Sequence, residues 1–296
     1  SSFKRTYRVN RIALGTAQFG VNYGVANNYG KVSLSEARSI LQLSKNHGIN
    51  VIDTAISYGD SEETLGQIGV DEFEVVTKLP ALPEGHVNAF DWVRAQVTGS
   101  LGRLQKESLS RVLLHRPEQL LGSKGVDLYR GLQSLRGDGK IGKLGISVYS
   151  TNELSDIIGR YKFDLVQAPF NLIDRQLHTS GWMSRLKDLG VEIHTRSAFL
   201  QGLLLMPEND IPAKFSNWKG LFRKWHQWLE VNRCTNVEAC IGFPLLYKEI
   251  DKVIVGVDSV IHLNQILKAF KSKRVINNFN LKINNKYLLK PSLWRN

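Results

Sequence analysis

Short β-branched and aliphatic runs alternate with longer stretches of helical periodicity along almost the whole chain. Eight runs predict buried strands: Ile12–Gly15, Val51–Thr54, Glu74–Leu79, Arg111–His115, Leu144–Ser147, Leu165–Ala168, Glu192–Arg196 and Lys252–Val257. The intervening stretches predict helices at Leu34–His47, Ser61–Ile68, Phe90–Leu104, Asp127–Asp138, Thr151–Arg160, Gly181–Leu189, Thr235–Tyr247 and Ser259–Ala269. Strict alternation favours parallel strands joined by helical crossovers, and this number of units predicts an α/β fold, a (β/α)8 TIM barrel.

The sequence predicts one domain. No Gly-x-Gly-x-x-Gly follows the first strand, since Gly15–Gly20 has the wrong spacing, which disfavours an open nucleotide-binding sheet. We expect a single barrel domain over residues 1–296, with its core at about residues 11–270 and a C-terminal tail at residues 271–296.

An insert after the seventh predicted strand, Leu203–Asn232, is the largest departure from even spacing. It is either a helix that packs on the barrel through Leu221, Trp225 and Trp228 or a loop on the catalytic rim. The sequence leaves open whether the tail after Val275 folds over the barrel mouth.

The formal net charge of +12 is the unusual bulk feature. With no arginine-rich arm and no zinc-finger spacing, it indicates a positive surface that attracts a phosphate-bearing small molecule rather than nucleic acid.

No apolar run is long enough to span a membrane, and Ser1–Arg5 has no apolar signal core, so we expect a cytoplasmic protein. Cys234 and Cys240 lie six apart in what reads as a helix, which predicts neither a disulfide nor a metal site. Oligomeric state stays open.

Polar residues follow the second, third and fourth predicted strands. Asp53 ends the second, with Tyr58 in the loop beyond it, Lys78 lies near the end of the third, and His115 ends the fourth. In a barrel these side chains converge on one mouth. A buried ammonium paired with Asp53 stabilises a nearby phenolate, so Tyr58 is suited to exchanging a proton with a carbonyl or alcohol oxygen.

These segments resemble the aldo-keto reductase family over nearly the whole chain. Val51–Ala55, followed by Tyr58-Gly59 and Glu62-Glu63, is similar to that family's first signature, and Val76–Leu79 and Leu113–Pro117 resemble the segments that carry its lysine and histidine. Gly139–Ser147 and Gln167–Asn171 are similar to its fifth and sixth strands. The resemblance implies Tyr58 as general acid/base, Lys78 and Asp53 as its tuning pair, and His115 as the group that orients the substrate carbonyl.

The resemblance also implies an extended nicotinamide cofactor across the barrel mouth. The implied cofactor-binding residues are Ser147, Gln167, Asn171, Arg196, Ser197, Phe199, Gln201, Gly202, Gly256, His262 and Gln265. The turn Ser197–Gly202 would wrap the pyrophosphate, a role that backbone amides in a turn suit.

Three departures from the family pattern bear on that site. Val148 replaces an asparagine beside the carboxamide serine, and Arg196 replaces an aromatic residue that stacks on the nicotinamide. His262 falls near an arginine that grips the 2'-phosphate, while Asp258 would repel a phosphate. NADPH is the first expectation on family grounds, with NADH open.

The leading hypothesis is therefore an NAD(P)H-dependent reductase of aldehydes or ketones. The opening Gly15–Gly20, with Tyr23-Gly24 and Asn27 after it, resembles a branch associated with carbohydrate or surface-polysaccharide pathways, which makes a sugar or nucleotide-sugar carbonyl a substrate option. A regulatory or sensor protein that binds the nucleotide without turnover is the alternative. A metal-dependent barrel hydrolase is disfavoured, because it would need several histidines and carboxylates at strand ends, and His194 lies inside a strand.

Overall fold

The computed structural model describes residues 10–27, 30–272, 283 and 285–294 of the chain. Its eight strands are all parallel and close into a barrel in chain order, β1 to β8. They are β1 (Ile12–Gly15), β2 (Val51–Asp53), β3 (Glu74–Leu79), β4 (Leu109–Leu114), β5 (Ile141–Ser147), β6 (Leu165–Pro169), β7 (Glu192–Arg196) and β8 (Lys252–Gly256). The predicted (β/α)8 fold is confirmed.

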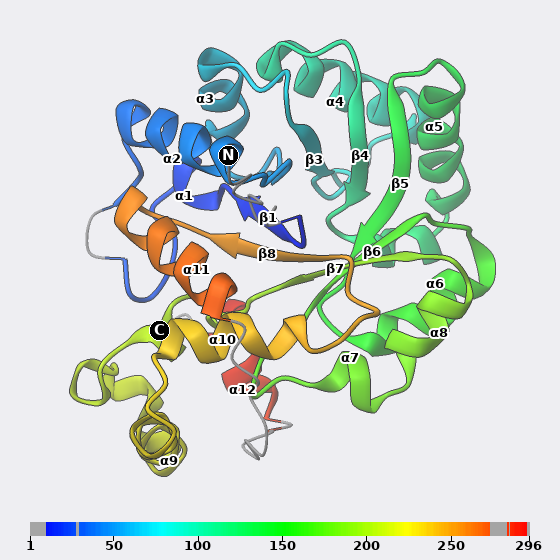
Figure 1. Cartoon of the computed structure of the whole chain (residues 1–296). Coiled ribbons are helices and arrows are strands. Elements are labelled where there is room, and N and C mark those ends of the chain that lie inside the picture. The colour runs from blue at the N-terminus through cyan, green and yellow to red at the C-terminus, as the bar shows by residue number, and fades with distance from the viewer. Residues whose placement is uncertain (1–9, 28–29, 273–282, 284, 295–296) are drawn as a thin grey trace.

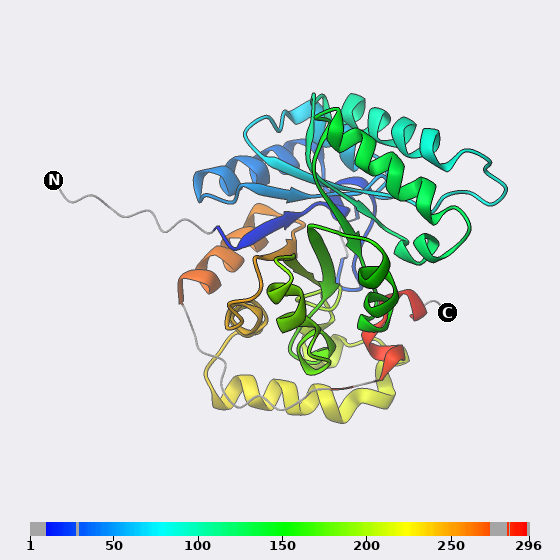
Figure 2. The same cartoon turned by 90° about the vertical axis from the view of Figure 1, so that its right-hand side faces the viewer.

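Helices surround the strands in both views (Figures 1 and 2). They are α1 (Ala17–Gly20), α2 (Leu34–Asn46), α3 (Ser61–Ile68), α4 (Ala89–Leu104), α5 (Gly125–Gly137), α6 (Leu154–Arg160), α7 (Gln176–Thr179), α8 (Trp182–Asp188), α9 (Lys219–Val231), α10 (Asn236–Leu245), α11 (Val260–Ser272) and α12 (Lys286–Leu289). Short 3-10 turns are η1 (Pro117–Leu121), η2 (Thr151–Glu153), η3 (Leu203–Leu205), η4 (Glu208–Asp210), η5 (Ala213–Trp218) and η6 (Pro291–Leu293).

Alternation along the strands divides the buried side chains into two clusters. Every second residue points into the barrel, where a small apolar layer forms from Ala13, Val51, Val76, Leu113, Leu165 and Ile254. The intervening residues point outward and join the helices in one large core.

Two predicted strands begin earlier than expected. The fourth runs from Leu109, which leaves His115 one residue beyond its end, and the fifth runs from Ile141, which pairs with Leu109. The start of the fifth strand was not predicted because Gly142 follows Ile141, and glycine is uncommon inside strands. A Cβ at Gly142 would lie only 2.7 Å from the Ser110 carbonyl oxygen, so the close approach of the two strands requires glycine there.

Two helical predictions also need correction. The segment Thr151–Arg160 divides into η2 and α6, because Ser150 caps the 3-10 turn through a capping box with Glu153. Cys234 lies before the helix that holds Cys240, because the Thr235 side chain caps that helix by accepting from the Glu238 amide. Both cysteines are buried.

The insert after β7 contains η3, η4, η5 and α9, and α9 lies at the periphery in both views (Figures 1 and 2). Its apolar face buries Phe222, Trp225 and Leu229, and Trp225 Nε1 donates to the Leu204 carbonyl at 3.1 Å. Leu221 and Trp228 are partly buried against the same core. The predicted packing helix is therefore present.

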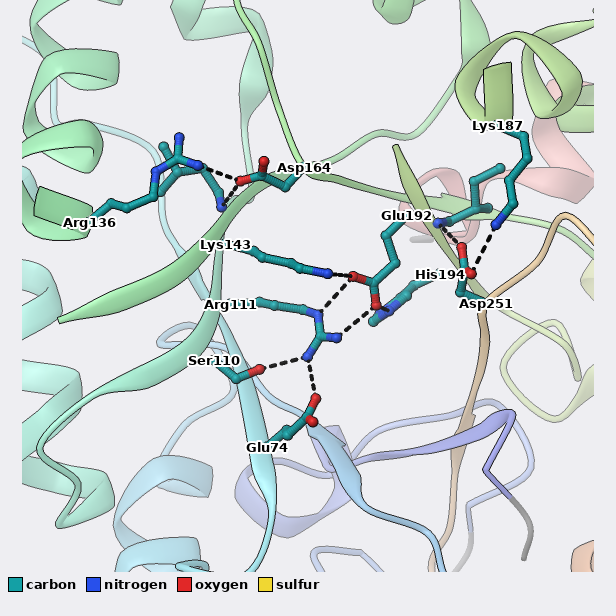
Figure 3. Close-up of polar contacts among 12 residues, drawn as sticks. Glu74, Ser110, Arg111, Arg136, Lys143, Asp164, Lys187, Glu192, His194 and Asp251 are labelled. Carbon is teal, nitrogen blue, oxygen red and sulfur yellow. Dashed lines mark hydrogen bonds and ion pairs between the residues drawn. The ribbon is translucent and has the colours of Figure 1, made fainter. Parts of the chain in front are cut away.

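A cluster of charged side chains, which we call the floor network, fills the amino-terminal end of the barrel (Figure 3). It comprises Glu74, Arg111, Lys143, Glu192 and His194. Arg111 donates to Glu192 at 2.8 Å and to Glu74 at 2.7 Å, while Lys143 and His194 Nε2 each reach Glu192 at 2.8 Å. Arg111 and Lys143 of this network are thus paired with carboxylates.

No described helix is long and apolar enough to cross a membrane.

Candidate active site

The carboxyl ends of the strands open into a cavity of about 610 Å³. It is lined by residues that follow β1, β2, β4, β5, β7 and β8, and by Pro291 and Ser292 of the C-terminal segment. All four residues predicted for proton chemistry lie at this end: Asp53, Tyr58 and His115 line the cavity, and Lys78 lies beneath them.

Lys78 is fully buried and joins two of these groups. Its Nζ donates to Asp53 Oδ1 at 2.6 Å and lies 3.4 Å from Tyr58 Oη. Burial, the largest single effect, would lower the pKa of Lys78, but the charges and hydrogen bonds of Asp53 and Tyr58 together outweigh it and the pKa is raised. The amine therefore stays an ammonium directly below the phenol.

Asp53 also accepts a hydrogen bond from Gln167, a contact that the sequence did not predict. Gln167 Nε2 donates to Asp53 Oδ2 at 2.8 Å, so both carboxylate oxygens are occupied. A buried carboxylate with fixed donors keeps its charge and its orientation, which in turn fixes Lys78.

His115 stands beside the phenol as a neutral ring. The Tyr58 and His115 rings lie 6.1 Å apart at 82°, edge to face. Burial, and after it the charges of Lys78, Arg196 and Arg116, lower the pKa of His115 to about 3. Its Nδ1 lies 3.2 Å from Ser57 Oγ, an arrangement in which the hydroxyl can donate and leave the ring proton on Nε2.

Close backbone packing positions the loop that carries Tyr58. A Cβ at Gly20 would lie 1.6 Å from the Tyr58 carbonyl oxygen, and one at Gly59, whose φ is +55°, would lie 2.4 Å from the Gly20 carbonyl oxygen. Neither position accepts a side chain, so the two glycines let α1 and the tyrosine loop touch.

Most of the predicted cofactor-binding residues line the same cavity: Ser147, Gln167, Arg196, Ser197, Phe199, Gln201, Gly202, Gly256 and His262. Asn171 and Gln265 do not. The buried Asn171 Nδ2 instead donates to the Ser197 carbonyl at 2.9 Å and so stabilises the turn Ser197–Gly202. Gln265 is exposed on α11.

The three departures from the family pattern have clear positions. Val148 is fully buried and points away from the cavity, but its carbonyl accepts from Arg196 Nη2 at 2.9 Å. His262 Nδ1 lies 3.5 Å from Asp258 Oδ1, and the His262 hydrogen bond leads the contacts that lower the pKa of Asp258. Both side chains line the cavity.

Two buried polar atoms of the lining fit a bound nucleotide. Within the described ranges, neither Gln18 Oε1 nor His262 Nε2 has a hydrogen-bond partner. Polar atoms that protein groups leave unsatisfied at a cavity wall are suited to a ligand's hydroxyl, amide or phosphate groups. The turn Ser197–Gly202, part of the cavity lining, has left-handed backbone at Ser197, Leu200 and Gln201, with φ values of 64°, 50° and 53°.

The sequence did not single out several residues of this cavity. Tyr149, Pro291 and Ser292 line it, as do Gln18 and Leu205. Leu205 belongs to the insert and Pro291 to the tail, so both segments reach the mouth. Only the position of Tyr149 just after a strand could have been noticed in the sequence.

Among residues 10–27, 30–272, 283 and 285–294, no group of three or more His, Cys, Asp or Glu residues is arranged to hold a metal ion.

The sequence profile of the Aldo/keto reductase family matches residues 11–281. Aflatoxin B1 aldehyde reductase member 2 of Rattus norvegicus is 29% identical over 204 residues, covering 64% of this chain and 52% of the relative. Oxidoreductase sirO of Leptosphaeria maculans is 26% identical over 217 residues, covering 70% and 65%. The matched segment thus spans about half to two thirds of these relatives. An aldo-keto reductase from Bacillus halodurans shares the fold, with a TM-score of 0.71, 19% identity and coverage of 88% and 86%.

Proposed function

The chain belongs to the aldo-keto reductase family, and from that premise we propose that it reduces an aldehyde or ketone to an alcohol with NAD(P)H. The observation that carries the proposal is the contact chain Asp53–Lys78–Tyr58, at 2.6 and 3.4 Å, which ends on a phenol at the wall of a large cavity. A protein that only bound a nucleotide would gain nothing from a buried ammonium beneath a tyrosine.

Proton transfer is the part of the reaction that this chain's own residues perform. Tyr58 donates its hydroxyl proton to the carbonyl oxygen, and the Lys78 ammonium stabilises the phenolate left behind. Asp53, fixed by Gln167, keeps Lys78 charged and in place. A nicotinamide cofactor held in this cavity would supply the hydride that, with the proton from Tyr58, converts the carbonyl to an alcohol.

His115 orients the substrate. Because its pKa is lowered to about 3, the ring is neutral at physiological pH. With Ser57 at Nδ1, the Nε2–H is free to donate a hydrogen bond to the carbonyl oxygen that Tyr58 protonates. Two donors on one oxygen fix the carbonyl plane and polarise it.

The cofactor is held by the cavity lining of β5, β6, β7 and β8. Ser147 and Gln167 would bind the carboxamide, the turn Ser197–Gly202 would hold the pyrophosphate, and His262 would contact the adenosine end. NADPH is the first cofactor to test on family grounds. NADH should be tested beside it, because the Asp258 carboxylate next to His262 would repel the 2'-phosphate that NADPH carries and NADH lacks. A sugar or nucleotide-sugar carbonyl remains the substrate option that the opening motif favours.

Tyr58→Phe tests the proposal. We expect turnover to fall by about 10²–10⁴-fold, because the variant lacks the proton donor while its shape is kept. Cofactor binding, followed by quenching of the six tryptophans during titration with NADPH and separately with NADH, should change little. Tyr129→Phe is the matched control, because the Tyr129 hydroxyl bonds the Lys162 carbonyl away from the cavity.

Two results would change the proposal. Wild-type turnover in Tyr58→Phe would remove Tyr58 from the reaction. Tight binding of a nicotinamide nucleotide with no turnover across a broad panel of carbonyls would favour the nucleotide-binding regulatory protein instead.

A further inference from the structure

Three cationic side chains surround a single aromatic ring at the cavity mouth. The Tyr149 ring has Arg196 Cζ at 4.9 Å, Arg116 Cζ at 5.2 Å and Lys290 Nζ at 5.4 Å from its centroid. Tyr149 and Arg196 line the cavity. We call Arg116, Arg196 and Lys290 the rim cations.

The rim cations have no acidic partner in the described part of the chain. No carboxylate there forms an ion pair with any of them within 4.0 Å. Arg196 is held by neutral acceptors, the Val148 carbonyl and Ser197 Oγ. Three like charges around one ring repel each other, and a tyrosine face does not neutralise them.

The nearby carboxylates are engaged elsewhere. Glu153 accepts from the backbone amides of Tyr149 and Ser150 and completes a capping box. Asp174 is buried, burial raises its pKa to about 6, and its carboxylate accepts from the Gln176 amide. The charge of Arg196 acts on Asp174 without forming an ion pair within 4.0 Å, and the positive charge of Arg116 and Lys290 is available to a ligand.

The rim cations lie next to the groups that act on the carbonyl. Arg116 directly follows His115, and Lys290 directly precedes Pro291 and Ser292 of the cavity lining. Arg116 and Arg196 are close enough to His115 for their charges to act on it. A group bound at Tyr149 thus lies within the reach of a small molecule whose carbonyl is at Tyr58.

The topology separates Arg116 and Lys290 from the turn proposed to hold the nucleotide pyrophosphate, whereas Arg196 ends β7 directly before that turn. The turn Ser197–Gly202, Gly256 and His262 follow β7 and β8, whereas Arg116 follows β4, which lies opposite β8 in the closed barrel. Tyr149 follows β5, and Lys290 comes from the C-terminal segment. Arg116 and Lys290 do not line the cavity themselves, but their contact with Tyr149, which does, places them at the side of the mouth formed after β4 and β5.

We propose that the physiological substrate is a carbonyl compound with an anionic group, a carboxylate or a phosphate, which binds to Arg116, Arg196 and Lys290 over the Tyr149 ring. This inference rests on the proposed reductase function. Guanidinium groups bind both anions through paired N–H donors, and Lys290 adds a point charge. Tyr149, which lines the cavity, provides the ring that the three cations share.

The test compares charged and neutral aldehydes of matched size. One pair is 4-oxobutanoate and butanal, and the other is glyceraldehyde 3-phosphate and glyceraldehyde. We expect kcat/KM to be at least about ten-fold higher for the charged member of one pair, because hydrogen bonds to charged groups give this scale of discrimination. The carboxylate and phosphate pairs show which anion is preferred. Raising NaCl from about 50 to about 500 mM should reduce the ratio by screening.

Variants assign the preference to the rim. In Arg116→Gln with Lys290→Gln, the charged-to-neutral ratio of kcat/KM should fall toward one, mainly through a higher KM for the charged aldehyde. Arg130→Gln, an exposed arginine on α5, is the matched control and should keep the wild-type ratio.

The outcomes separate the two proposals. Turnover of both pairs with ratios near one, or a preference that survives loss of Arg116 and Lys290, overturns the anion site and leaves the reductase intact. Absence of turnover for all four aldehydes in the presence of bound cofactor overturns both.

Discussion

The floor network and the rim cations place arginine and lysine at opposite ends of the same barrel, but with different partners. At the floor, Arg111 and Lys143 meet Glu192 and Glu74 at 2.7 to 2.8 Å. At the rim, the described residues supply no carboxylate within 4.0 Å of Arg116, Arg196 or Lys290. Paired charges close and stabilise one end, whereas unpaired charges leave the other end able to bind an anion.

The Asp53–Lys78 pair resembles both sets. It lies at the mouth, as the rim cations do, but its charges are paired, as in the floor network. Its side chains are 4% and 1% exposed, so the pair serves both stability and chemistry. The comparison predicts that substitutions at the mouth change turnover, substitutions at the floor change stability, and substitution of Lys78 changes both.

Lys78→Met should have the largest effect. It leaves the buried Asp53 carboxylate with Gln167 as its remaining side-chain donor, which should lower the free energy of unfolding by about 3–5 kcal/mol. Loss of the ammonium beneath Tyr58 should lower kcat by at least about 10²-fold. Urea unfolding and steady-state kinetics measure the two effects.

Lys143→Met at the floor is the matched control for this variant. Its side chain is 50% exposed, so the free energy of unfolding should change by less than about 1 kcal/mol, with turnover retained. A Lys78→Met protein with normal kcat would show that the buried pair has only a structural role.

Glu192→Gln should destabilise the protein without affecting catalysis. Glu192 accepts hydrogen bonds from Arg111, Lys143 and His194, and its side chain is only 12% exposed. In the variant, Arg111 loses the negative charge of its buried partner. We expect the free energy of unfolding to fall by about 3 kcal/mol. Glu74→Gln, at a side chain that is 50% exposed, should cost less than about 1 kcal/mol. Equal losses in the two variants would contradict the importance of Glu192.

The pH dependence of stability should separate His115 from the floor carboxylate. Burial, then Lys78, Arg196 and Arg116, lower the pKa of His115 to about 3, whereas the unfolded chain protonates this ring below about pH 6.5. The unfolded state therefore binds more protons, and stability falls as pH decreases from about 6.5, by at most about 1.4 kcal/mol per pH unit from this group.

The Glu192 carboxylate titrates in a lower window. Burial would raise its pKa, but hydrogen bonds from His194, Arg111 and Lys143 outweigh burial and hold the pKa well below its usual range. Its contribution is lost only below about pH 4. We would measure the free energy of unfolding of the wild type and of His115→Gln at pH 7 and at pH 5. The loss of stability between pH 7 and pH 5 should be smaller in the variant. The buried His194, whose pKa is also lowered, contributes the same sign and explains a residual difference. An unchanged difference in His115→Gln would disprove the assignment.

Gly202→Ala should give the smallest effect and probes the strained turn at the mouth. Gly202 has a φ of +88°, and an added Cβ would lie 2.8 Å from Ala26 Cβ, so the free energy of unfolding should fall by about 1–3 kcal/mol. Tryptophan quenching should show weaker binding of the nicotinamide nucleotide. Gly102→Ala, within α4 and with no atom near the added Cβ, should instead stabilise the protein by about 0.5–1 kcal/mol. Destabilisation in both variants would show that the turn has no special demand for glycine.

Much of the mouth could be predicted because strand ends carry its residues. Asp53, Tyr58 and His115 each lie at or after a strand end, so the barrel prediction already brought them together with Lys78. The position of Val148 followed from the same period of two, since a neighbour of the inward Ser147 must point outward. The contact of Gln167 with Asp53 could not be predicted, because it depends on how deep each side chain reaches across the barrel.

The sequence by itself determined the eight-fold alternation of strands and helices, and with it the parallel barrel and the end at which its polar residues meet. Those features follow from local periodicity and from residues that are neighbours in the chain. The tertiary structure alone decided which charges find partners. Arg111 meets Glu192 across the floor, and Arg116 and Lys290 both meet the Tyr149 ring at the mouth, only because barrel closure joins strands and a C-terminal segment that lie far apart in the sequence.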